Sequence, residues 1–172
     1  MPLLRVSLIC LLGALGAAPP VSAAPAKPRG TVVFVANRAT AKASRAVARV
    51  IRSQLADVPV RFQVVWVKRL PGGLAAQVVA ARRVGAKRGA LVVLWCNHPS
   101  VDQVFLFITR FREGRILVRR VDPSRDGVLG RFEAIGAIVR SGVGAILAGA
   151  RIGVKPPPPP RRAAPPRTVV PP

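Results

Sequence analysis

Residues 31–67 read TVVFVANRATAKASRAVARVIRSQLADVPVRFQVVWV, and the order of patterns in this stretch decides the fold. It opens with an apolar run, residues 31–36, of the kind that forms a strand buried on both faces. A helical pattern follows at residues 40–58, and a second β-branched run at residues 60–67 completes a β-α-β unit. The apolar positions that recur at helical spacing are Val47, Val50, Ile51, Leu55 and Val58.

The residues that follow continue the alternation of strands and helices. They predict a helix at 74–88 with Leu74, Val78 and Ala81 facing inward, strands at 90–96, 104–109 and 115–121, and a final helix at 129–150. The order β-α-β-α-β-β-β-α predicts an α/β fold, a single small domain spanning residues 31–154, with a mixed sheet flanked by helices. Right-handed crossovers place the first three strands parallel in the order 2-1-3, and a tight turn at Glu113-Gly114 adds an antiparallel hairpin.

The two ends of the chain differ in composition from this domain. Residues 1–23 have the pattern of a secretory signal peptide, with Arg5 before an apolar run and small residues that suit cleavage after Ala23. The run is too short and too interrupted for a transmembrane anchor, which is the competing interpretation. Residues 24–30 form a linker, and residues 155–172 a Pro-rich tail that we expect to be extended and disordered. We therefore expect an exported protein, periplasmic or secreted, with no transmembrane span in the mature chain.

The chain is strongly basic. Lys and Arg number 28 against six Asp and Glu, for a formal net charge of +22. The 31–154 domain holds 21 of these cations and all six acids, so its own charge is about +15 and does not come from the tails. GC-rich coding accounts for the excess of Arg over Lys but leaves the scarcity of acids unexplained. Such a charge indicates an anionic partner.

Two groups of cations are candidates for binding a polyanion. The first lies on the polar face of the helix predicted at 40–58, and the second on the helix predicted at 74–88. Our leading hypothesis is a non-enzymatic binding or assembly module at the cell envelope, whose partner is an anionic envelope component or a protein. The candidate residues are Lys42, Arg45, Arg49, Arg52, Arg82, Arg83, Lys87 and Arg88.

A basic nucleic-acid-binding protein is the alternative hypothesis. The two cationic groups favour it, while the signal peptide argues against nucleic acid as the partner in the cell. Base stacking would need exposed aromatic rings, and the aromatic residues mostly fall at apolar strand positions that predict a place in the core. They are Phe34, Phe62, Trp66, Trp95, Phe105 and Phe107.

The segment Trp95-Cys96-Asn97-His98-Pro99-Ser100 ends a buried strand, where ligands often bind in α/β proteins. A hydrolase that uses Cys96 and His98 is a third, remote hypothesis, because residues two apart on a strand point the same way without meeting as nucleophile and base. The chain has one histidine and lacks the Gly-rich phosphate-binding motifs. We therefore predict no catalytic residue, no cofactor and no metal, and we interpret the segment as a strand end followed by a turn.

The remaining acids are scattered. Asp122 and Asp126 could share a loop, and we expect them to cap the final helix or to pair with nearby arginines. Glu133 and Arg140 lie seven apart on one face of that helix, which predicts buried or half-buried ion pairs with strand arginines such as Arg119. Residues 134–150 are nearly all apolar, and we expect them to pack over the sheet rather than to enter a membrane.

Several of these segments also carry a resemblance. The apolar strands, the basic strand at 114–121 and the final helix with Glu133, Arg140 and Ser141 before a Pro-rich linker resemble uncharacterised exported proteins of myxobacteria and their relatives. The resemblance covers residues 31–160 and implies export and the α/β fold, without any assigned catalytic residue. The topology is also similar, at the level of fold alone, to the amino-terminal domain of TolB, a periplasmic protein.

Export with cleavage near Ala23 is a testable prediction of the amino-terminal pattern. In a cell fractionation of the native host, mass spectrometry should find a mature amino terminus close to Ala24 in the periplasmic or secreted fraction. Recovery of Met1-containing protein from the cytoplasm alone would contradict it.

Overall fold

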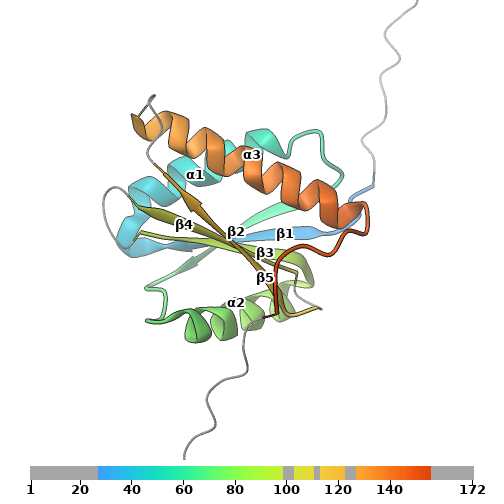
Figure 1. Ribbon diagram of the computed structural model, residues 1–172, viewed down its shortest axis with the longest axis horizontal. Coiled ribbons are helices and arrows are strands. Elements are labelled where there is room, and N and C mark those ends of the chain that lie inside the picture. Colours follow the sequence, from blue (N-terminus) through green and yellow to red (C-terminus); the bar gives the residue numbers. More distant parts are fainter. Residues whose placement is uncertain (1–26, 99–102, 111–112, 123–126, 156–172) are drawn as a thin grey trace, which may run out of the picture.

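The computed structural model describes residues 27–98, 103–110, 113–122 and 127–155 (Figure 1). Its elements are β1 (Thr31–Asn37), the 3-10 helix η1 (Arg38–Thr40), α1 (Ala41–Gln54), β2 (Arg61–Val67), α2 (Leu74–Arg88), β3 (Ala90–Asn97), β4 (Val104–Arg110), β5 (Arg115–Val121) and α3 (Gly127–Leu147). This confirms the predicted α/β class and order. The first helix ends at Gln54, short of the predicted 58, because residues 55–60 form turns ahead of the strand.

The five strands form one sheet in the order β2-β1-β3-β4-β5. β1 is parallel to both of its neighbours, β2 and β3, while β3, β4 and β5 run antiparallel to one another. The predicted order 2-1-3 followed by a hairpin is therefore confirmed. It follows from right-handed crossovers, which carry the chain from β1 to β2 over one face of the sheet and from β2 to β3 over the other.

The helices cover both faces of the sheet. Figure 1 shows α1 and α3 side by side on one face and α2 on the opposite face. Side chains of β1 alternate between the two layers, so Val32, Phe34 and Ala36 pack with α1 and α3 while Val33 and Val35 pack toward α2. Residues on both sides of β1 are therefore buried.

Helices α1 and α3 approach each other closely at Gly136. A Cβ atom added there would lie 2.7 Å from Val50 Cγ1 and 2.9 Å from Gln54 Cγ. About one helical turn after Gly136, the Arg140 guanidinium donates to both carboxylate oxygens of Asp57 and, at 2.7 Å, to the carbonyl of Gln54. Its hydrogen bonds to the Asp57 carboxylate lower the pKa of that group to about 2.

The ion pairs expected for Glu133 and Arg140 are wrong. Both side chains are exposed; among the described residues Glu133 forms no ion pair with Arg119 or another strand arginine, and Arg140 pairs with Asp57 after α1. The physical reason is the layer arrangement, since α3 lies beside α1 and turns Arg140 toward that helix. The sequence pattern did not point to Asp57.

On the opposite face, a buried tryptophan organises the loop before α2. Trp95 stacks on Phe107 with ring centroids 5.1 Å apart, and its indole Nε1 donates to Gln77 Oε1 at 2.9 Å. Gln77 Nε2 in turn donates to the Pro71 carbonyl at 3.0 Å. Val78 and Ala81 are buried as predicted, but Leu74 is exposed because it is the first residue of α2, beyond the cover of the sheet.

Some predictions fall outside the described residues. These include the signal peptide, most of the Pro-rich tail, and the capping role of Asp126. Asp122 lies within the described residues, and its carboxylate forms an ion pair of 2.6 Å with Arg120. Within the described ranges, none of the helices has the length and apolar character needed to cross a membrane. The apolar side of α3 packs over the sheet, where Ile135, Val139 and Val143 are fully buried.

The close approach at Gly136 yields a matched pair of variants. Gly136→Val should destabilise the fold by about 1–3 kcal/mol, because the new side chain would overlap Val50 and Gln54. Gly144→Val on the same helix should leave stability nearly unchanged, since an added Cβ there meets nothing within 4 Å. Thermal unfolding followed by circular dichroism compares the two, and equal melting temperatures would contradict the close packing of α1 on α3.

Candidate anion-binding surface

The four cations predicted on the first helix form one exposed stripe on α1. Their spacing of three, four and three residues keeps them on one face of a helix, and all four are exposed. The opposite face, with Ser44, Val47, Ala48 and Ile51, is buried against the sheet and α3. We call this stripe the α1 basic face, and its residues are Lys42, Arg45, Arg49 and Arg52.

A groove lies between the α1 basic face and the edge strand β2. It has a volume of about 350 Å³ and is lined by Arg45, Arg49 and Arg52, by Ala48 of the same helix, and by Val64 and Trp66 of β2. The Arg45 guanidinium carbon lies 6.0 Å from the centre of the Trp66 ring, and that of Arg52 lies 5.9 Å from the Phe62 ring. These distances suit cation–π contacts, worth about 0.5–1 kcal/mol each at an exposed site.

The positive charge of the α1 basic face has no carboxylate partner among the described residues. Among the residues that the structure describes, no ion pair joins any of the four to an acid. Three of the four described acids pair with cations elsewhere, namely Asp57 with Arg140, Glu113 with Arg110 and Asp122 with Arg120. Among the described residues, no carboxylate therefore competes with an incoming anion for the N–H groups of these arginines.

The prediction that most of the aromatic residues belong to the core is confirmed, but it is wrong for Trp66, which is 37% exposed. The buried rings are Phe34, Trp95 and Phe107, and the half-buried rings that pack against the core are Phe62 and Phe105. Trp66 lies on the outermost strand of the described sheet, where no further described strand flanks it, and the Arg45 side chain lies over its ring. A single apolar strand position does not reveal whether its strand is central or at an edge, so the sequence could not place this ring.

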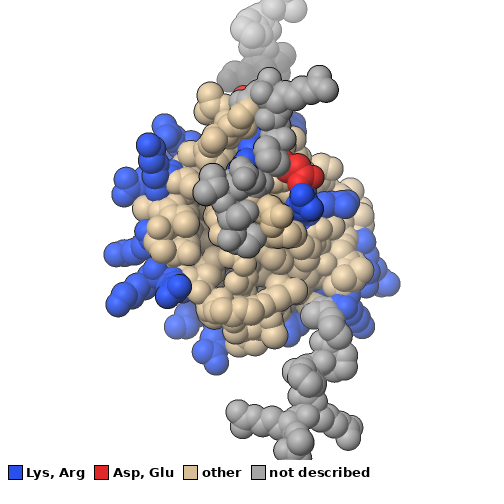
Figure 2. All heavy atoms as spheres, turned by 60° about the vertical axis from the view of Figure 1, so that its left-hand side comes forward, with Lys and Arg blue, Asp and Glu red and all other residues tan. Residues whose placement is uncertain are grey.

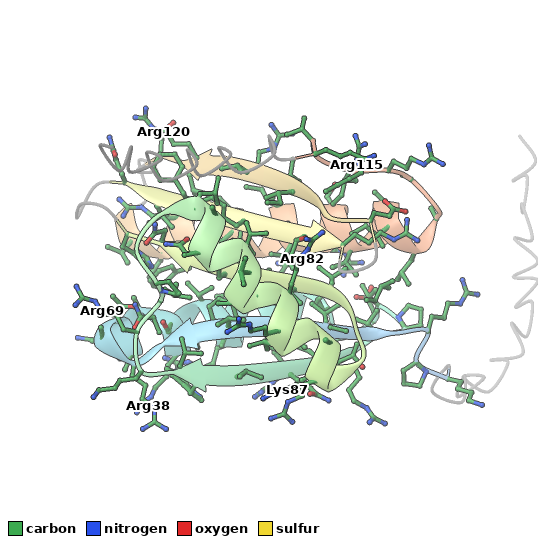
Figure 3. The ribbon with its side chains drawn as sticks, turned by 90° about the horizontal axis from the view of Figure 1, so that it is seen from below. Arg38, Arg69, Arg82, Lys87, Arg115 and Arg120 are labelled. Atoms are coloured by element: carbon green, nitrogen blue, oxygen red, sulfur yellow. The ribbon has the colours of Figure 1, made fainter. Side chains whose placement is uncertain are left out.

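The second predicted group of cations lies on α2 and does not join the first. Its members, Arg82, Arg83, Lys87 and Arg88, are all exposed, but α2 covers the face of the sheet opposite to α1. Figure 3 shows Arg82 and Lys87 extending to different sides of the helix. The Arg82 guanidinium packs against Gly114 in the turn before β5. The α2 cations are therefore dispersed, whereas those of α1 line one groove.

The space-filling view agrees with this distribution. Figure 2 shows Lys and Arg side chains projecting around the domain, with very little Asp or Glu between them. The field at this surface is therefore positive in several directions, and it would attract anions from solution. What distinguishes the α1 basic face is its groove and its aromatic ring.

A hollow of about 670 Å³ lies at the carboxyl ends of β1 and β3, where ligands often bind in α/β folds. Its polar lining includes Asn37, Asn97 and Arg69, and the amide of Gln77, which is occupied by Trp95 and Pro71. Cys96 and His98 do not line it. Among the described residues, no three His, Cys, Asp or Glu side chains gather closely enough to hold a metal ion.

The environment of Cys96 and His98 does not favour nucleophilic chemistry. Burial raises the pKa of the Cys96 thiol to about 12, because a thiolate would lose its hydration. Burial also lowers the pKa of His98, and the positive charge of Arg131 lowers it further. At neutral pH the thiol is therefore protonated, whereas the nucleophile in thiol chemistry is the thiolate.

The thiol gives a direct test of this environment. In a Cys10→Ser chain, where Cys96 is the sole thiol, a thiol reagent at pH 8 should react very slowly with the native protein and fully after unfolding in guanidinium chloride. Rapid reaction of the native protein would show an accessible thiolate and would revive the hydrolase hypothesis.

Comparison of the chain with protein-family models, with curated proteins and with solved structures finds no match in any of the three. The resemblance to exported proteins of myxobacteria therefore stays a prediction. The α1 basic face and its groove are interpreted from their own geometry and charge.

Proposed function

We propose that this protein is an exported, non-enzymatic binding module that associates with anionic components of the cell envelope through the α1 basic face. One observation carries the proposal. Arg45, Arg49 and Arg52 line a single groove beside an exposed tryptophan, and no carboxylate among the described residues neutralises them. Export comes from the amino-terminal pattern, which points to the envelope as the place where such a surface would act.

The chemistry of the groove suits phosphate, sulfate or carboxylate groups. A guanidinium offers several N–H donors in a plane, which matches the oxygens of these anions better than a lysine ammonium does. Cation–π contacts of Arg45 with Trp66 and of Arg52 with Phe62 favour positions of these side chains beside the groove, which would reduce the side-chain entropy lost on binding. The buried, protonated Cys96 supports a binding role in preference to the hydrolase.

The exposed Trp66 also supports the alternative, a nucleic-acid-binding protein. A tryptophan beside guanidinium groups is a surface on which an unpaired base could stack while the arginines bind phosphates. The signal peptide favours the envelope as the site of action. A comparison of heparin, anionic lipid vesicles and a single-stranded oligonucleotide separates the two hypotheses.

Charge reversal tests the proposed surface. Changing Lys42, Arg45, Arg49 and Arg52 together to Glu should sharply lower the salt concentration at which the protein elutes from heparin, and should abolish binding to phosphatidylglycerol vesicles. The fold should be retained, because all four side chains are exposed. Wild-type binding should itself weaken steeply with salt, since charges separated by more than ~8 Å are screened at physiological ionic strength.

The matched control reverses the same number of charges on α2. Arg82, Arg83, Lys87 and Arg88 changed to Glu give the same net charge, so a smaller loss of retention would localise binding to α1. Equal losses in the two variants would mean that net charge alone governs binding. Tight binding to the oligonucleotide but not to vesicles would favour the nucleic-acid alternative.

A further inference from the structure

The two edge strands of the sheet, β5 and β2, differ in whether another segment of the chain pairs with their outer side. At the β5 edge, Ile116 and Val154 exchange backbone hydrogen bonds of 2.8 and 2.9 Å, and Arg115 donates to the carbonyl of Gly153. That edge is therefore partly covered by the segment after α3. At the β2 edge, no backbone hydrogen bond from any described residue reaches the outer side of the strand.

The free edge of β2 is regular and long enough to accept another strand. Its seven residues pair with β1 in one unbroken register, from Thr31 opposite Arg61 to Asn37 opposite Val67. Proteins usually blunt an exposed edge with a bulge, a proline or an inward charge, because an open edge pairs with other chains. The sequence RFQVVWV has no such residue between Phe62 and Val67.

The groove and the free edge are built from the same residues of β2. The Arg61 amide donates to the Gly30 carbonyl just before β1, and backbone groups alternate along a strand. The N–H and C=O groups of Phe62, Val64 and Trp66 therefore point outward to the free edge. The side chains of these three residues lie on the α1 side of the sheet, under Arg45 and Arg52.

We infer that β2 binds an extended acidic peptide segment of a partner protein as an added sixth strand. Main-chain hydrogen bonds to Phe62, Val64 and Trp66 would hold the segment, and its side chains on the α1 side would meet Arg45, Arg49 and Arg52. Acidic residues are therefore favoured at alternate positions. The other positions would face the side of the sheet on which the half-buried Val65 and Val67 lie, which favours apolar residues there.

Charge complementarity selects this occupant over a second copy of the chain. Two copies paired at β2 would bring two sets of arginines together, on chains that each carry a formal charge of +22. An acidic segment gains from the same field. The inference rests on the anion-binding role proposed above for the α1 arginines, and it adds a backbone requirement that heparin and lipid do not have.

The test separates strand addition from simple charge attraction. The probe is a fluorescent, capped peptide with alternating Glu and Val, matched to the seven residues of β2, and binding to the full chain is followed by anisotropy. A second peptide of the same sequence and charge carries N-methyl groups on its Glu and Val amides, so it cannot donate main-chain hydrogen bonds to β2 in either direction of pairing. We expect the N-methylated peptide to bind at least about tenfold more weakly, and equal affinity would overturn the inference.

A variant of the protein gives the complementary measurement. Val64→Pro removes an outward N–H without breaking the pairing with β1. Because Val64 also lines the groove, the readout is the preference of the protein for the Glu-Val peptide over the N-methylated peptide, which should fall about tenfold in Val64→Pro. Val64→Thr keeps the N–H and the branched shape and should keep that preference. Loss of heparin retention in the α1 charge-reversal variant would support the proposed function separately, and an undiminished preference in a folded Val64→Pro protein would overturn strand addition. Dimerisation that depends on Val64, without peptide binding, would assign the edge to a second copy and would also overturn it.

Discussion

β1 is the strand on which the rest of the domain depends. Its residues from Val32 to Ala36 are at most 3% exposed, so it must have helices on both of its faces and strands on both of its edges. Right-handed crossovers meet this requirement, because they bring α1 over one face and α2 over the other while β2 and β3 flank β1 in parallel. The β4–β5 hairpin extends the sheet, and α3 completes the layer that α1 begins.

The same arrangement fixes where the charges lie. A core of this kind accepts few ions, and of the Lys and Arg residues that the structure describes only Arg131 is buried. The domain has few acids that could form ion pairs with its cations. Three of the four described acids form ion pairs away from the α1 basic face. Arg45 and Arg52 lie instead at cation–π distances from the rings of Trp66 and Phe62. Such a contact does not neutralise a guanidinium, so its charge stays available to an anion.

The contrast between the sheet edges follows from the order of the chain. β5 is followed by α3, and the chain returns along the β5 edge through Gly153 and Val154. β2 has no such neighbour among the described residues, since the chain leaves it for α2 on the other face. The open edge and the α1 arginines thus adjoin each other as a consequence of topology. Neither feature alone would specify a partner, but together they define its backbone form and its charge.

The sequence by itself determined the elements, their order and the parallel core, because apolar runs and helical spacing reflect local burial directly. The short, Val-rich run from Val32 to Ala36 predicted a buried strand, and the spacing of four cations predicted one shared helix face, made up of Lys42, Arg45, Arg49 and Arg52. The pairing of Arg140 with Asp57, the exposure of Trp66 and the separation of the α2 cations from those of α1 were decided only by the tertiary structure. Each of these depends on which strand lies at an edge or which helices share a layer. That is a relation between segments distant in the chain, which no local pattern contains.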